Sequence, residues 1–333
     1  MKKSLLNAAR YLILFIILGF GGWYFHSNYD RIAAQASFTK GNIALLIALN
    51  IATIFVETIR LRLTVKKVGY DPGQLVSAYL FGLMQAVNHV IVKAGTFSTG
   101  YYLSRRGHIS FHSYLAFVVT YIVFFVLGSG LLGLVVSMGY TFTGFQVSYL
   151  IYAFFMAITF LSLLFMALAN VKLPLHRFPR FLSKIMGGVR FIYSDVKLIA
   201  SLALVEMVYY TLCSIRFMVA ITMFSGSISF LDSVVVTTVG NFMRIASFVP
   251  GGLGVGEVVS GWTAGLLGNE AGLSGIALGL DRLIYVVCIA ILAGVGFFSL
   301  SGRSEFRPPS NDERDSEALE EDVHDGKLTG TDC

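Results

Sequence analysis

The sequence predicts an all-α protein that crosses a membrane several times, and three observations support this fold class. Hydrophobic residues make up 56% of the 333 residues and charged residues only 13%, whereas soluble domains are about 25% charged. Several apolar runs exceed roughly 18 residues, enough for a helix to cross a ~30 Å hydrocarbon core. Lys and Arg residues gather at the ends of these runs, as they do in membrane proteins.

The apolar runs predict six full spans. We place them at about 8–26, 42–64, 113–137, 148–170, 199–223 and 273–300. The first run follows Lys2, Lys3 and Arg10, as in a signal peptide. The only small-residue pattern resembling a cleavage site lies too far beyond the run, so we interpret the run as an uncleaved span.

Two further apolar stretches, at about 75–104 and 231–268, carry glycines and polar residues at their centres. Each is predicted to form two short helices joined by unwound chain. An unwound backbone is costly in lipid and persists only where protein or a wet cavity surrounds it.

The charge distribution sets the orientation of these segments. With the N-terminus in the cytoplasm, the internal segments contain 19 of the 25 Lys and Arg residues. Basic clusters flank 75–104 on both sides, so this stretch is predicted to enter and leave from the cytoplasm. The flanks of 231–268 are uncharged or acidic, so it is predicted to enter and leave from outside. The alternative is a plain bundle of eight full spans, which also places both termini inside.

Two opposed re-entrant hairpins and six spans give eight membrane segments in an inverted-topology repeat. The first repeat covers about 8–137 and the second about 148–300, within one transmembrane domain at 1–300. Transporters built in this way bind their substrate between the repeats near the midplane.

The connection at 171–198 is basic and has one apolar helical face. The residues of this face are Phe181, Ile185, Val189, Ile192 and Val196. We expect a helix at the cytoplasmic membrane surface, with a simple linker as the alternative. The tail at 301–333 is acidic, and its composition predicts disorder.

The sequence FVPGGLGVGE at 248–257 is the most informative break. Pro250 cannot continue a helix cleanly. The glycines allow unusual backbone angles, and exposed amides at a helix start can bind an anion. Arg244 and Glu257 flank the break. The alternative is a tight packing hairpin with Glu257 in a structural ion pair.

Ionisable residues at membrane depth are functional candidates. Arg282 lies about 14 Å into the last span, and Glu257 is its preferred partner, with a lipid phosphate competing for it. Lys93 at the first break suits a phosphate, unless it reaches back to the interface. His89 is expected to be a hydrogen-bonded packing residue. In the second span, a polar stripe is predicted to face the bundle interior: Asn50, Thr53, Glu57, Arg60 and Thr64.

These arguments give the candidate site. The substrate-binding candidates are Asn88, Lys93, Arg244, Pro250, Gly251, Gly252, Gly254, Gly256, Glu257 and Arg282. The candidates for an ion pair or for coupling are Glu57, Arg60, Asp281 and Glu257. A weaker polar stripe at Glu206, Tyr209 and Arg216 is given a structural role. No soluble catalytic motif, nucleotide loop or metal-ligand spacing occurs, so no enzymatic activity, cofactor or metal is predicted.

The sequence resembles the flippase-like membrane region of the lysylphosphatidylglycerol synthases and their stand-alone relatives. The resemblance rests on FVPGGLGVGE, on Leu267-Gly268 and on the arginine-bearing stretch DRLIY at 281–285. In the first half, the family has an Arg, then an Asn, then a glycine-containing break. In this sequence those positions hold Arg60 and Arg62, Asn88 and Lys93-Ala94-Gly95. The stretch at 93–103 departs from the family's Pro-Gly-Arg version. The resemblance covers about 10–300.

The resemblance implies a flippase or transporter that moves an anionic lipid headgroup (phospholipid, aminoacyl-lipid or polyprenyl-phosphate-linked) across the cytoplasmic membrane. No soluble aminoacyl-transfer domain follows the membrane region, so synthase activity is not expected. The alternatives are a membrane enzyme acting on a lipid phosphate and a non-transporting scaffold for a lipid-modifying or glycosyltransferase partner. The expected partners are membrane lipids and, in the scaffold case, such an enzyme. The basic residues at span ends are attributed to topology and lipid headgroups, so no nucleic acid is predicted.

Overall fold

The structure is a computed structural model that describes residues 26–27, 30, 34, 36–67, 69–105, 109–142, 148–170, 180–247 and 249–301. The described residues form ten α-helices and one 3-10 turn, and they contain no strand. The all-α prediction is therefore confirmed. Most of the predicted first span at 8–26, and the tail from 302, lie outside the described residues.

Among the described residues, five helices are long and apolar enough to cross a membrane. They are α3 (Lys40–Lys67), α6 (Phe111–Phe142), α7 (Tyr149–Asn170), α9 (Val196–Thr222) and α12 (Ala271–Ser301). Each covers one of the predicted full spans from 42–64 onward. Contacts divide the chain into a helical body that ends at Gly296 and a terminal unit that begins at Phe297.

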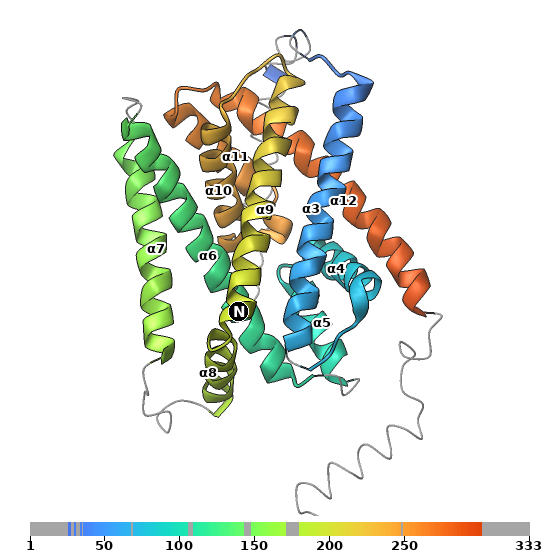
Figure 1. Cartoon of the computed structure of the whole chain (residues 1–333). Helices are drawn as coiled ribbons and strands as arrows, with labels where there is room; N and C mark the ends of the chain where they lie inside the picture. The colour runs from blue at the N-terminus through green and yellow to red at the C-terminus, as the bar shows by residue number, and fades with distance from the viewer. Residues whose placement is uncertain are drawn as a thin grey trace, which may run out of the picture. The chain divides into compact units, whose positions relative to one another are not determined.

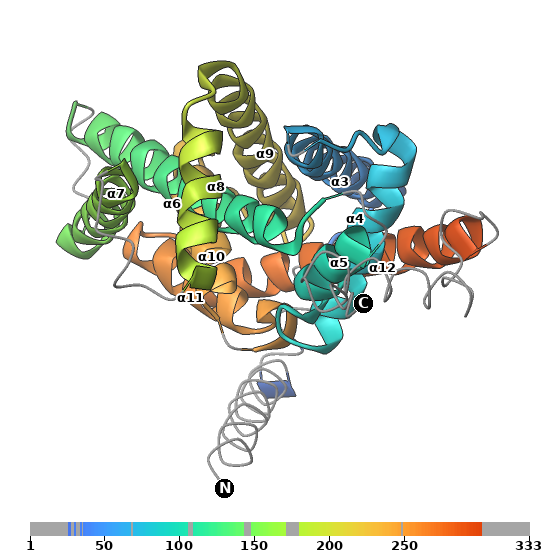
Figure 2. The same ribbon diagram turned by 90° about the horizontal axis from the view of Figure 1, so that it is seen from below.

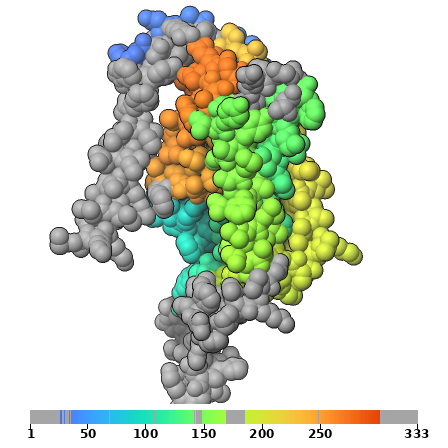
Figure 3. Space-filling view, turned by 90° about the vertical axis from the view of Figure 1, so that its left-hand side faces the viewer, coloured from blue at the N-terminus to red at the C-terminus, as the bar shows by residue number. Residues whose placement is uncertain are grey.

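The outer surface of these long helices is apolar. On α7, the side chains of Met156, Phe160 and Leu161 are all more than half exposed. Figure 3 shows α7 in light green along this face. Soluble monomers rarely expose large contiguous apolar patches, whereas lipid accepts them. The chain is therefore a multi-pass helical membrane protein.

Both broken stretches form pairs of short helices, as predicted. The first pair is α4 (Gly73–Val90) and α5 (Ala94–Arg105). The second is α10 (Phe230–Ala246) and α11 (Val255–Leu266), with the 3-10 turn η2 (Pro250–Gly252) between them. In Figure 1, α10 and α11 lie in the upper part of the helical body, and α4 and α5 in the lower part.

Small residues let the two helices of each pair pack closely. A Cβ at Gly95 of α5 would lie 1.8 Å from the carbonyl oxygen of Met84 on α4. A Cβ at Gly240 of α10 would lie 2.0 Å from the Ser260 hydroxyl on α11. Neither position accepts a side chain without moving a helix. Glycines therefore allow the two helices of each pair to pack closely, in addition to allowing the breaks between them.

The helix predicted in the connection is present as α8 (Arg180–Tyr193), and its apolar face packs against other helices. Ile185 and Val189 are buried in a cluster with Leu115 and Ala116 of α6, and α8 lies across α6 in Figure 2. Val196 belongs to α9 instead and is 75% exposed. An apolar stripe specifies which face is buried but not what covers it, and here a helix covers it instead of lipid.

Candidate functional site

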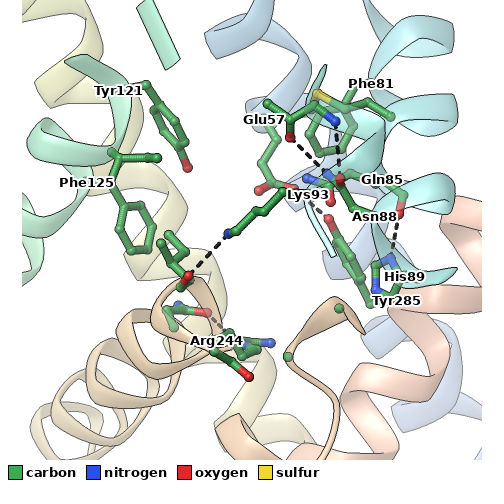
Figure 4. A pocket seen from close by; sticks show the side chains of 18 of the residues that line it. Glu57, Phe81, Gln85, Asn88, His89, Lys93, Tyr121, Phe125, Arg244 and Tyr285 are labelled. Carbon is green, nitrogen blue, oxygen red and sulfur yellow. Dashed lines mark hydrogen bonds between the residues drawn. The ribbon is translucent and has the colours of Figure 1, made fainter. Parts of the chain in front are cut away.

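The two breaks meet at one cavity of about 360 Å³ inside the helical body. Residues from α3, α4, α5, α6, α9, α10, η2 and α12 line it. Figure 4 shows Lys93 extending across this space toward α10, with Tyr121 and Phe125 on one side and His89 and Tyr285 on the other. The predicted encounter of the two breaks is thus observed.

The first break holds Lys93 in an uncommon backbone conformation. Its φ of 58° lies in the left-handed region, which is costly for a residue with a side chain. Its Nζ donates to the carbonyl oxygen of Ile245 near the end of α10, at 3.2 Å. Asn88 links the two helices of the pair by hydrogen bonds with the hydroxyl and the backbone amide of Thr96. Asn88 therefore lines the cavity but also has a structural role.

The glycines of the second break make room for specific neighbours. Gly251, Gly252 and Gly254 have φ values of 62°, 66° and 80°, which favour glycine. A Cβ at Gly252 would lie 2.9 Å from the Cα of Arg244, and one at Gly256 would lie 2.6 Å from the Arg244 Cγ. The turn therefore wraps around the Arg244 side chain. Gly251 and Gly252 line the cavity.

Three other predicted residues of this break, and the acid that follows it, do not line the cavity: Pro250, Gly254, Gly256 and Glu257. Pro250 starts the 3-10 turn, and Gly254 precedes the first residue of α11. These two residues shape the turn that positions the cavity wall.

The predicted ion pair between Arg282 and Glu257 is wrong. The Arg282 guanidinium instead donates from Nη2 to the Gly251 carbonyl oxygen at 2.8 Å and lies 2.9 Å from His89 Nε2. Glu257 is within electrostatic range of Arg282 but forms no ion pair with it. Because Glu257 lies in the first turn of α11, beyond the turn that contacts α4, the carbonyl of that turn reaches Arg282 first.

Glu57 and Arg60 form the predicted pair at 3.2 Å, inside a larger buried network. Arg60 also bonds Glu206 of α9 at 3.0 Å, and the Tyr285 hydroxyl donates to Glu57 at 2.8 Å. The Arg60 guanidinium stacks on Tyr121 at 4.1 Å from the ring centroid. All five residues of the predicted polar stripe are buried, so its orientation toward the bundle interior is confirmed.

Asp281 belongs to a second buried network. It accepts two hydrogen bonds from Arg216 of α9, at 2.9 and 2.7 Å, in the paired geometry typical of strong Arg–carboxylate contacts. Asn50 donates to the same carboxylate at 3.0 Å. The carboxylate is therefore occupied by partners from α3 and α9.

The remaining cavity cations differ from Arg60 and Arg216 in their partners. Within the described part of the chain, Lys93, Arg244 and Arg282 form no ion pair with a carboxylate. Each bonds a neutral group instead, and Arg244 bonds the side-chain amide of Asn241. Even partial burial of a cation without a counter-charge is unfavourable, and a bound anion reduces that cost. The described residues bring no three His, Cys, Asp or Glu side chains together as a metal site.

Sequence reasoning missed the aromatic wall of the cavity. Tyr121 and Phe125 are one helical turn apart on α6, and Tyr209 approaches from α9. The buried polar residues of α6, such as Thr120 and Ser129, are small and do not mark Tyr121 and Phe125 as cavity residues. The spacing of four between Tyr121 and Phe125 is the one available hint.

Comparison with known families agrees with this architecture. The family described as lysylphosphatidylglycerol synthase TM region matches residues 8–293 of this chain. A search among curated proteins gives no match. The matched region contains every residue of the cavity, and the chain belongs to this family of membrane regions.

Proposed function

We propose that this member of the lysylphosphatidylglycerol synthase membrane-region family is a flippase or transporter for a lipid with an anionic headgroup. One observation carries the proposal: Lys93, Arg244 and Arg282 line one cavity inside the helical body, and within the described ranges none of them forms an ion pair with a carboxylate. A phosphate offers several acceptor oxygens to such donors. Each cation can exchange its neutral partner for the headgroup.

The surroundings of the cavity favour a lipid over a free anion. The cations lie among aromatic and aliphatic side chains such as Phe81, Phe117 and Ile122. The helices around them expose apolar surface outward. A lipid that moves through this space needs a polar site for its headgroup and apolar contacts for its chains.

We also propose the finer architecture that transport of this kind requires. In it, α4–α5 is a re-entrant hairpin from the cytoplasmic side, and α10–α11 is one from the opposite side, in an inverted repeat in the cytoplasmic membrane. The basic end of α3, with Arg62, Lys66 and Lys67 just before α4, supports the cytoplasmic assignment. Cysteines introduced at exposed Asp71 and Ser227 test it. A membrane-impermeant maleimide is expected to label only the Ser227→Cys variant in intact cells.

Transport is tested with the full chain in liposomes of phosphatidylglycerol and phosphatidylcholine that contain acyl-chain-labelled phosphatidylglycerol. Dithionite bleaches the labelled lipid in the outer leaflet, and the protein is expected to make the labelled lipid of the inner leaflet accessible as well. Arg244→Gln is expected to slow this movement of lipid at least about tenfold, since a hydrogen bond to a charged group contributes ~1.5–3 kcal/mol. Arg62→Gln, which removes an arginine paired with Asp71 outside the cavity, is the matched control.

The same preparation separates the alternatives. Conversion of the labelled lipid to a new product, seen by mass spectrometry, supports a membrane enzyme. If the labelled lipid neither moves nor is converted, the result supports the scaffold alternative. Equal transport by Arg244→Gln and Arg62→Gln contradicts the assignment of the cavity cations as the headgroup site.

A further inference from the structure

The protonation state of His89 follows from its hydrogen bonds. Its Nδ1 lies 2.7 Å from the carbonyl oxygen of Gln85, one turn earlier on α4. A carbonyl oxygen only accepts, so Nδ1 carries a hydrogen and donates it. Its Nε2 lies 2.9 Å from Arg282 Nη2. A guanidinium only donates, so Nε2 accepts with its lone pair. Only the neutral ring, with its hydrogen on Nδ1, satisfies both contacts.

A second proton on His89 is incompatible with this arrangement. It would point an N–H at the N–H of Arg282 and place a positive ring beside a guanidinium. The groups around the ring are Arg282 and Tyr285 of α12, Arg244 of α10 and the backbone of Gly251 in η2. In the described ranges no carboxylate forms an ion pair with His89. Protonation would therefore break the contact with Arg282.

The His89 contact lies where the two breaks touch. Arg282 Nη2 bonds His89 on α4 and the Gly251 carbonyl in η2 at the same time. The fit is close, because a Cβ at Gly251 would lie 2.7 Å from the His89 ring. We call the set His89, Arg282 and Gly251 the latch. It joins the C-terminal end of α4, next to the first break, to the turn η2 of the second break, beside the cavity.

We propose that His89 is a proton-binding site whose protonation releases the latch and separates η2 from α4. The neutral ring keeps the breaks together. The protonated ring loses its contact with Arg282 and is repelled by Arg282 and Arg244. A proton thereby controls access to the cavity through a single histidine.

The latch also couples the proton to the headgroup, a consequence that rests on the proposed function. An anionic headgroup that takes the donors of Arg282 frees His89 Nε2 to bind a proton. Its negative charge then favours the protonated ring. By linkage, a proton on His89 raises the affinity for the headgroup by the same factor. Proton and anion are therefore expected to bind together.

The latch is tested by hydrogen exchange of the peptide 249–257 in the full chain in nanodiscs, between about pH 8 and about pH 5. This range brackets the ordinary titration of histidine. After correction for the intrinsic pH dependence of exchange, we expect the wild-type peptide to exchange about tenfold faster at the lower pH. His89→Gln keeps an acceptor for Arg282 but does not titrate, so its peptide is expected to stay slow at both pH values. His89→Ala has no acceptor and is expected to be fast at both.

His112→Gln is the matched control, because His112 lies in the first turn of α6 and does not line the cavity. It is expected to keep the wild-type response. A wild-type pH response in His89→Gln, or slow exchange in His89→Ala at both pH values, overturns the latch. If His89→Ala does not fold, His89→Gln decides alone.

The liposome assay run over the same pH range distinguishes the two proposals. If the peptide responds to pH but no lipid moves, the latch stands and the proposed function fails. If lipid moves but the peptide is insensitive to pH, the proposed function stands and the latch fails.

Discussion

Two groups of charged residues contribute to the lining of the same cavity, and they differ in how they are neutralised. On α3, α9 and α12, the carboxylates of Glu57, Glu206 and Asp281 pair with Arg60 and Arg216. At the breaks, the hydrogen-bond partners that the described residues give Lys93, Arg244 and Arg282 are neutral groups. We call the first group the paired network and the second the open cluster.

The difference separates structural charges from candidate binding charges. Removing one partner from a buried pair leaves an uncompensated charge, which is strongly destabilising. Among the described residues, the cations of the open cluster form no ion pair, so losing one of them removes repulsion along with a neutral hydrogen bond. Substitutions in the paired network should therefore affect stability, and those in the open cluster should affect lipid binding.

Asp281→Asn should have the largest effect on stability. It leaves Arg216 buried without a counter-charge, with an expected cost of about 3–5 kcal/mol. The measurement is thermal unfolding of the purified chain in detergent, with Asp71→Asn as the control in an exposed loop. Equal melting temperatures for the two variants would mean that the paired network is not structural.

Gly252→Ala should have the next largest effect, and it tests how closely the turn packs against Arg244 of the open cluster. The new Cβ lies 2.9 Å from the Arg244 Cα in a backbone with φ of 66°, so strain of about 1–3 kcal/mol is expected. We also expect slower lipid movement, because the turn holds the Arg244 side chain in place. Gly139→Ala, where no neighbouring atom lies within 4 Å, is the matched control. A variant that melts like this control would contradict the tight fit.

Lys93→Asn should separate function from stability most sharply. Asn tolerates the left-handed conformation that Lys93 adopts with φ of 58°. The free energy of unfolding should therefore change by less than about 1 kcal/mol, while lipid movement falls at least about tenfold with the lost charge. Melting temperature and dithionite accessibility are measured on the same sample. Unchanged transport would remove Lys93 from the open cluster.

The sequence predicted the helices well because its signals for them are local. The first broken stretch, predicted at about 75–104, spans Gly73 to Arg105, and the second, predicted at about 231–268, spans Phe230 to Leu266. Apolar runs, glycines and one proline define these limits without knowledge of the rest of the fold.

Partners between distant segments were harder to predict. Arg216 and Asp281 are 65 residues apart, and no local rule joins them. Arg282 contacts the Gly251 carbonyl instead of Glu257 because of the depth to which η2 packs against α4. The apolar face of α8 was visible in the sequence, but its cover by α6 was not. Tertiary packing decides all three cases.

Asp195→Asn should have the smallest effect, because it removes a partly exposed ion pair instead of a buried one. Asp195 caps α9 through the Leu198 amide and pairs with Lys67 at 2.6 Å. The hydrogen bond from Lys67 lowers the pKa of Asp195. An Asp carboxyl whose pKa is lowered on folding stabilises the folded state at pH values above its unfolded-state pKa of ~3.9. This stabilisation is lost as the pH falls through the folded-state pKa.

Asn caps a helix equally well, so the variant isolates the ion pair. We expect a slightly lower melting temperature near neutral pH and a difference from wild type that disappears in acid. A difference that persists in acid would assign the effect to the cap instead of the charge, and one as large as that of Asp281→Asn would mean that burial does not distinguish the paired network.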